Sequence, residues 1–173
     1  MSDYFKEILN HSKKASSAMS KLYAEDRSRI LMNISGFLLS KKDGILEANR
    51  IDIDRAKSNN ISAPMINRLV LTSEKIDQLS RDVEKIAQME DPLNQTLENW
   101  TNPSNGLQFT KVSVAIGVIG IIYESRPNVT IDAACLCLRS GNISILRGGS
   151  ECIETNKKLY ECIQDALKDL NFD

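Results

Sequence analysis

The sequence predicts an α/β fold in which a helical region and a β-hairpin precede a parallel β-sheet. Apolar residues recur every three or four positions over about the first ninety residues, as in amphipathic helices. From about residue 95 apolar and polar residues alternate, and from about residue 116 short apolar runs alternate with helical patterns. The order strand, helix, strand, helix favours parallel strands with right-handed crossovers, so we expect a Rossmann-like sheet.

The composition is that of a globular protein without a general attraction to polyanions. The 173 residues are 42% hydrophobic, and 22 lysines and arginines nearly balance 23 aspartates and glutamates. The uncharged runs are far shorter than the roughly 18 residues of a membrane-spanning helix, and the charged N-terminal segment lacks the apolar centre of a signal peptide. We therefore expect a cytoplasmic protein that binds neither nucleic acid nor membranes.

The helical region, residues 1–94, contains two apolar stripes and several recognisable helix starts. The stripes are formed by Ile30, Leu31, Ile34, Phe37 and Leu38 and by Ile76, Leu79, Val83 and Ile86. Ser62, followed by Pro64, is a typical N-cap residue, and so is Thr72 or Ser73. Short helices joined by tight connections follow from this pattern.

Residues 95–115 predict a β-hairpin. Two alternating segments flank the sequence TNPSNG, which contains the residue types that turns require. Trp100 and Phe109 can pack together on one face of this hairpin. Three arrangements stay open at this point: a surface ribbon, a layer over the core, or an arm that completes the sheet of another subunit.

Residues 116–173 predict a β-α-β-α unit. The uncharged run at its start does not alternate, as expected for a parallel strand covered on both faces. Gly117 and Gly120 in this run are explained by close packing of a helix. The helix that follows ends near Gly141, which suits a left-handed C-cap. An apolar strand at residues 143–147 and a last helix complete the unit.

Each of these strands ends in a polar loop, and we expect the two loops to be neighbours because parallel strands end at one edge of a sheet. In the first loop Arg126 has a planar set of donors for a carboxylate or phosphate. Glu124 can orient Arg126 or accept a ribose hydroxyl, and Asn128 or Thr130 can cap the helix. A purely structural salt bridge between Arg126 and Glu124 is the alternative.

The second loop begins at Arg147, where the second strand ends. Gly148 and Gly149 can let a ligand approach the backbone, and Ser150 can meet a phosphate at the start of the last helix. A turn that the strand-to-helix connection requires explains the two glycines equally well. Neither loop is a G-x-G-x-x-G or Walker A motif.

The four cysteines at positions 135, 137, 152 and 162 predict no metal site. They lack histidine or cysteine partners at zinc spacing, and the C-x-x-C motif is absent. We expect free thiols that behave as small buried hydrophobic residues.

The stretch GVIGIIYESRPNVTIDAACLCLRSGNISILRGGSE, with the weaker ILEANRIDIDRAKSNNISAPMINRLVLT and MEDPLN, resembles the γ-glutamyl phosphate reductase family of the aldehyde dehydrogenase superfamily. The resemblance extends over essentially the whole chain. It implies an aldehyde dehydrogenase-like fold in which residues 1–94 and 116–173 belong to the cofactor-binding domain and the 95–115 hairpin is an oligomerisation arm. It also implies NADPH-dependent reduction of L-glutamate 5-phosphate to L-glutamate 5-semialdehyde in proline biosynthesis, through a cysteine thiolate.

The resemblance gives roles to both loops. The cofactor-binding candidates are Arg147, Gly148, Gly149, Ser150 and Glu151. Ser125 stands where aldehyde dehydrogenases commonly place an asparagine that stabilises the oxyanion. Arg126 is expected to hold the γ-phosphate or the α-carboxylate of the substrate, with Glu124 and Asn128 beside it.

Members of this family are longer than this chain, so we expect the catalytic domain and its nucleophilic cysteine to lie outside it. The parallel sheet is then incomplete and the isolated chain inactive, and an exposed apolar strand edge predicts self-association. The expected partners are glutamyl phosphate as substrate and either further copies of the chain or a complementary C-terminal half. The alternative function is a non-catalytic module that binds nucleotide or docks onto a separate catalytic half.

Overall fold

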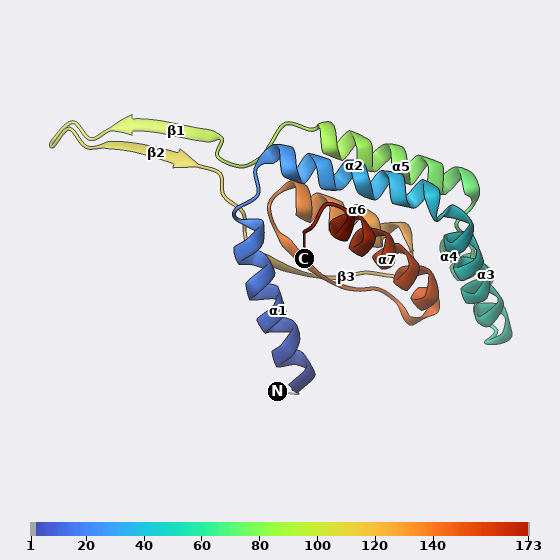
Figure 1. Cartoon of the computed structure of the whole chain (residues 1–173). Coiled ribbons are helices and arrows are strands. Elements are labelled where there is room, and N and C mark those ends of the chain that lie inside the picture. Colours follow the sequence, from blue (N-terminus) through green and yellow to red (C-terminus); the bar gives the residue numbers. More distant parts are fainter. Residues whose placement is uncertain (1–2, 173) are drawn as a thin grey trace.

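The computed structural model describes residues 3–172 and contains seven α-helices, one short 3₁₀ helix and four strands in that part of the chain (Figure 1). In chain order these are α1 (Asp3–Met19), α2 (Ala24–Ser40), α3 (Lys42–Ser58), α4 (Ala63–Leu69), α5 (Ser73–Gln88), β1 (Thr96–Thr101), β2 (Gln108–Val112), β3 (Val118–Ile122), α6 (Asn128–Arg139), β4 (Ile143–Arg147), η1 (Ser150–Cys152) and α7 (Ile153–Asp169). The predicted α/β class and the predicted order of elements are confirmed. None of the helices between residues 3 and 172 is long and apolar enough to cross a membrane.

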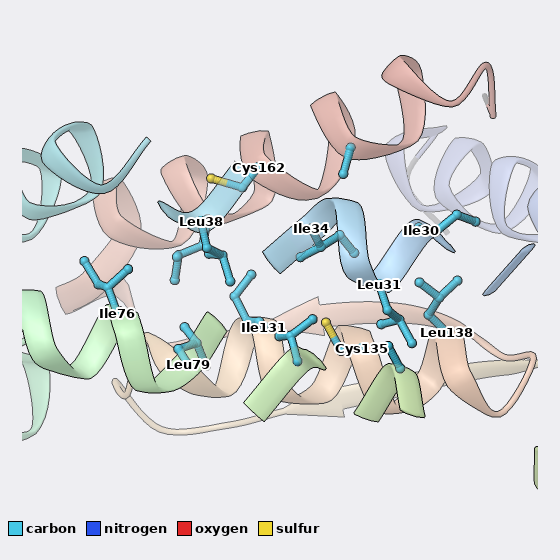
Figure 2. Close-up of a cluster of buried hydrophobic side chains, with 14 of the residues drawn as sticks. Ile30, Leu31, Ile34, Leu38, Ile76, Leu79, Ile131, Cys135, Leu138 and Cys162 are labelled. Atoms are coloured by element: carbon cyan, nitrogen blue, oxygen red, sulfur yellow. The ribbon is translucent and has the colours of Figure 1, made fainter. Parts of the chain in front are cut away.

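Helix α2 lies at the centre of the core and packs against α5, α6 and α7. Figure 2 shows side chains from all four helices meeting there. The fully or almost fully buried members include Ile30, Leu31, Ile34, Leu38, Ile76, Ile131, Cys135 and Cys162. Each large aliphatic side chain stabilises the fold by roughly 1.5–3 kcal/mol when it is fully removed from water. Both predicted apolar stripes therefore contribute to one core.

The starts of α4 and α5 agree with their predicted positions. Thr72 is the N-cap residue of α5, and its hydroxyl oxygen accepts a hydrogen bond from the Lys75 backbone N–H at 3.3 Å. Ser62 occupies the N-cap position of α4 with Pro64 in the first turn, but its side chain makes no capping hydrogen bond. The extended backbone at Ser62 and the fixed φ of proline are therefore what define this start.

The strands β3 and β4 form a parallel pair, as predicted, with Ile122 opposite Arg147 at their carboxyl ends. Helix α6 packs on β4, and α1 contacts both strands. The expectation that the first strand is covered on both faces is wrong for the described residues, because alternate side chains of β3 face solvent: Val118 is 38% and Ile122 is 78% exposed. One face of this two-stranded sheet is therefore open.

The glycines around β3 do not serve close helix packing. A Cβ atom built on Gly117 or Gly120 would meet nothing within 4 Å. Gly117 instead has a φ of 116°, which side chains rarely adopt, and its N–H donates to Asn142 Oδ1 at 2.8 Å. Gly141 has the predicted left-handed conformation, with a φ of 69°.

The β1–β2 hairpin projects away from the helices (Figure 1). Every residue of the two strands is exposed, so the arrangement as a layer over the core is wrong. Trp100 pairs with Phe109 across the antiparallel ribbon, and their rings stack with centroids 5.1 Å apart. At the base of the hairpin the Ser113 hydroxyl donates to the Pro92 carbonyl oxygen at 2.6 Å.

Candidate functional site

The loops that follow β3 and β4 lie side by side at the carboxyl edge of the strand pair. The Tyr123 backbone N–H donates to the Arg147 carbonyl oxygen at 3.1 Å, which extends the parallel ladder by one bond. The Ser125 hydroxyl then donates to the Glu151 carboxylate and joins the two loops directly. This hydrogen bond is the main reason why the pKa of Glu151 is lowered.

Gly148 and Gly149 are required by the close approach of the first loop. Neither residue has a positive φ, so backbone conformation alone does not demand glycine here. A Cβ atom on Gly149 would overlap Ser125 Oγ, and one on Gly148 would lie 2.5 Å from Asn156 Nδ2 and 3.0 Å from the Tyr123 ring. The absence of a side chain at both positions lets the two loops touch.

Glu124 is held between two arginines. Its Oε1 atom lies 3.0 Å from Arg126 Nε in an ion pair, and its Oε2 atom accepts a hydrogen bond from Arg68 Nη1 at 2.7 Å. The predicted pair between Glu124 and Arg126 therefore exists. Arg68, near the end of α4, was missed because it lies 56 residues before Glu124 and no sequence spacing connects the two. All three side chains are about half exposed, so solvent screens the pairs.

Neither Asn128 nor Thr130 caps helix α6, and that expectation is wrong. Asn128 is the first helical residue, and its side-chain amide donates to Asp132 Oδ2 at 3.0 Å. Thr130 is buried, and its hydroxyl donates to Asn156 Oδ1 at 2.9 Å and accepts from the Tyr123 hydroxyl 2.7 Å away. These hydrogen bonds hold the first loop, through Tyr123, against Asn156 of α7.

Arg147 and Ser150 lie on the open side. Both are exposed, and among residues 3–172 the Arg147 guanidinium has no hydrogen-bond or ion-pair partner. They line a cavity of about 880 Å³ together with Tyr123, Gly148 and Gly149 and with residues of α7. A volume in this range is typical of sites for drug-sized ligands. The candidate cofactor residues from Arg147 to Glu151 all face this one cavity.

The four cysteines are free and buried, as expected of small hydrophobic residues. Burial raises the pKa of the Cys152 and Cys162 thiols to about 11 and also raises the pKa of Cys135 and Cys137. The thiolate is the nucleophilic form of cysteine. At neutral pH these four side chains therefore remain protonated and shielded.

In sequence and in structure the chain is similar to gamma-glutamyl phosphate reductases. No protein-family model matches it. It is 39% identical over 165 residues to a gamma-glutamyl phosphate reductase of Thermodesulfovibrio yellowstonii, which covers 94% of this chain and 39% of the relative. The crystal structure of gamma-glutamyl phosphate reductase from Thermotoga maritima superposes with a TM-score of 0.91 at 34% identity, over 96% of this chain and 40% of that one.

More distant structures share the fold. A NAD-dependent benzaldehyde dehydrogenase from Corynebacterium glutamicum superposes with a TM-score of 0.67 at 18% identity, over 90% of this chain and 31% of that one. The fold is thus aldehyde dehydrogenase-like. The chain spans about two-fifths of the length of the reductases that it matches. Over that span the chain matches gamma-glutamyl phosphate reductases both in sequence and in fold.

Proposed function

We propose that this chain supplies the cofactor loop and the substrate loop of a γ-glutamyl phosphate reductase, the enzyme that reduces L-glutamate 5-phosphate to L-glutamate 5-semialdehyde with NADPH in proline biosynthesis. The observation that carries the proposal is the direct bond between Ser125 of one loop and Glu151 of the other. It joins the loops that contain Arg126 and Arg147 at a single sheet edge, and ligands of open parallel sheets bind at such edges, which supports the proposal. The names of the matching relatives support the choice of this reaction.

The cofactor lies, in this proposal, in the cavity beside the β4–α7 connection. Arg147 is suited to a phosphate of NADPH because its guanidinium has no partner among residues 3–172 and presents a planar set of donors. The hydroxyl of exposed Ser150 adds a further donor, and Glu151 can accept a ribose hydroxyl. Gly148 and Gly149 line the same cavity. When bound, NADPH supplies the hydride of the reduction.

The substrate lies beside the β3–α6 loop. Glu124 fixes Arg126 through its Nε atom and leaves the two terminal nitrogens of the guanidinium free among the described residues to hold an anionic group. Asn128 is adjacent, with its amide bonded to Asp132. Ser125 has a single hydroxyl proton, and Glu151 accepts it, so an oxyanion role for Ser125 requires that this bond opens.

The nucleophilic thiolate comes, in this proposal, from outside residues 3–172. The raised pKa values and the burial of the four cysteines support this part of the proposal. Fluorescence titration of the chain with NADPH tests the cofactor loop. We expect saturable binding that Arg147→Gln weakens about tenfold, as for the loss of a charge-assisted hydrogen bond, whereas the matched change Arg50→Gln on the exposed side of α3 has no effect. Equal affinity of the Arg147 variant and the original chain contradicts the proposed cofactor site.

Docking onto a separate catalytic half is a second candidate function, and exposed apolar residues in β3 and in the segment just before it favour it. Val114, Ile116 and Ile122 are 71%, 83% and 78% exposed, which is unusual for large aliphatic side chains. Size-exclusion chromatography after mixing with the remaining part of the Thermotoga maritima relative tests it. A mixed complex with NADPH-dependent turnover supports docking, and two separate peaks without turnover contradict it.

A further inference from the structure

A small cavity beside the substrate loop contains charges of both signs. Its volume is about 290 Å³, and it lies between the end of α4, helix α5 and the first turn of α6. The polar side chains that line it are of three kinds: the cations Arg68 and Lys75, the carboxylates Asp82 and Asp132, and the amides Gln78 and Asn128. The volume is close to the roughly 300 Å³ at which ligand sites begin, so the cavity suits one end of a small molecule.

The negative side of the cavity contains a carboxylate without a cation. Asp132 accepts a hydrogen bond from Asn128 at 3.0 Å and has no ion-pair partner among residues 3–172. Burial raises its pKa, which is the response of a carboxylate that lacks a compensating charge. Asp82 differs, because Gln78 at 2.9 Å and Lys85 at 2.8 Å both donate to it. Asp132 is therefore the acceptor that is available for a positively charged ligand group.

The positive side of the cavity is connected to the substrate loop. Arg68 uses its Nη1 atom for Glu124, and its other N–H groups have no partner within the described residues. Lys75 donates to the Val70 carbonyl oxygen at 2.7 Å and keeps two further ammonium protons. Arg68 and Arg126 thus meet on one carboxylate and face different surroundings, since Arg68 lines the small cavity and Arg126 does not.

We propose that this cavity recognises the α-amino acid end of the substrate, with Asp132 binding the α-ammonium group and Arg68 the α-carboxylate. The inference rests on the proposed function, because a glutamyl phosphate carries such a zwitterionic end opposite its reacting acyl phosphate. The sequence left open whether Arg126 binds the γ-phosphate or the α-carboxylate, and this inference assigns the two groups to different arginines. Arg68 takes the α-carboxylate, and Arg126 is left for the γ-phosphate on the other side of Glu124.

Three simple ligands test the two charges separately by isothermal titration calorimetry of the full chain. L-glutamate has both α-groups, glutarate lacks the ammonium group, and 4-aminobutyrate lacks the α-carboxylate. We expect the chain to bind L-glutamate about tenfold more tightly than either of the others, as for one charge-assisted hydrogen bond. Asp132→Asn removes the preference over glutarate only, and Arg68→Gln removes the preference over 4-aminobutyrate only.

Matched controls are Asp54→Asn and Arg50→Gln, two exposed residues of α3 that pair with neighbours on the same helix. Both controls keep the full preference for L-glutamate. The side-chain amide signals of Gln78 and Asn128 in a nitrogen-edited NMR spectrum are expected to shift at about tenfold lower concentrations of L-glutamate than of glutarate. Equal binding of the three ligands, or no saturable L-glutamate binding at millimolar concentration, overturns the inference.

The NADPH titration separates this inference from the proposed function. Asp132→Asn and Arg68→Gln lie outside the cofactor cavity and are expected to leave NADPH affinity unchanged. If NADPH binds and the preference for L-glutamate is absent, the inference fails and the proposed function stands. If NADPH does not bind the original chain, the proposed function fails at its cofactor loop, whatever the amino acid titrations give.

Discussion

The contact between the β3–α6 and β4–α7 loops depends on one side-chain hydrogen bond and on the missing Cβ atoms of two glycines. Ser125 and Glu151 lie 26 residues apart, and the hydrogen bond between their side chains joins the two loops. Gly149 lies against this bond, where a Cβ atom would overlap the Ser125 side chain. The glycines were expected to serve either a ligand or a turn, and their contacts show a third reason, which is close packing of one loop on the other. These residues were predictable from the sequence because arginine, serine and paired glycines at strand ends are typical of ligand-binding loops. Their contacts with one another were not predictable, because the two loops are far apart in the sequence.

Gly149→Ala is predicted to destabilise the protein by about 1–3 kcal/mol, the usual cost of overpacking. The new Cβ atom would overlap Ser125 Oγ and lie 2.7 Å from Glu151 Oε2 and 3.0 Å from Ser125 Cβ, so the two side chains must turn away and lose their hydrogen bond. Urea denaturation measures the change. Gly36→Ala is the matched control: its Cβ atom meets nothing within 4 Å, so helix propensity alone is expected to stabilise the protein by about 0.5–1 kcal/mol. A Gly149 variant as stable as the control contradicts the packing argument.

The bond between Ser125 and Glu151 predicts a particular pH dependence. Because the hydrogen bond lowers the pKa of Glu151 in the folded protein, its stabilising contribution is present above the unfolded pKa, near 4.5, and is lost as the pH falls through the lower folded value. In Ser125→Ala the NMR titration midpoint of the Glu151 carboxyl is expected to rise. The difference in unfolding free energy between Ser125→Ala and the original chain is expected to shrink from neutral pH to pH 3. An unchanged midpoint contradicts the assignment of this bond.

At the scale of elements, local patterns predicted more than long-range arrangement. The second parallel strand lies at its predicted residues, 143–147, because an apolar run between turn residues specifies a strand locally. The exposed face of β3 was not predictable from its own residues. An unbroken apolar run indicates a strand that is buried on both faces, and it does not show whether another element covers each face. The projection of the hairpin and the pairing of Arg68 with Glu124 depend on contacts between distant segments, and no spacing encodes them.

The connection from α5 to the hairpin is held by two buried arginines, and this predicts a stability effect far from the loops. Arg27, 3% exposed, donates to Asp91 Oδ2 at 2.6 Å, and Arg139, 7% exposed, donates to the Met89 carbonyl oxygen. Asp91→Ala leaves the Arg27 charge buried without its partner. We expect a loss of about 2–3 kcal/mol, below the 3–5 kcal/mol of a fully buried pair because Asp91 is partly exposed.

Urea denaturation of Asp91→Ala and of Asp54→Ala checks this expectation. Asp54 and its partner Lys57 are both about 60% exposed. Removing this surface pair is expected to cost less than about 1 kcal/mol. If both variants lose the same small amount, the arginines do not anchor the base of the hairpin.

At the scale of the whole molecule, the helices enclose a core and leave the carboxyl edge of β3 and β4 open. All four cysteines are buried, and Cys135 and Cys162 belong to this core, so their raised pKa values fit a structural role. The open edge carries both arginine loops and two cavities, one beside each loop. We therefore propose that the two loops act as one ligand-binding edge, with the cofactor on one side of the Ser125–Glu151 bond and the substrate on the other.

Backbone amide NMR of the chain during titration with NADPH tests this arrangement of the two ligands. We expect shifts that saturate together at residues 147–151 and, through the Ser125–Glu151 bond, at residues 123–126, while the signals of Asn102 and Asn105 at the hairpin turn do not move. Shifts at the hairpin or across the helices without change at residues 147–151, or no shifts at all, contradict the claim.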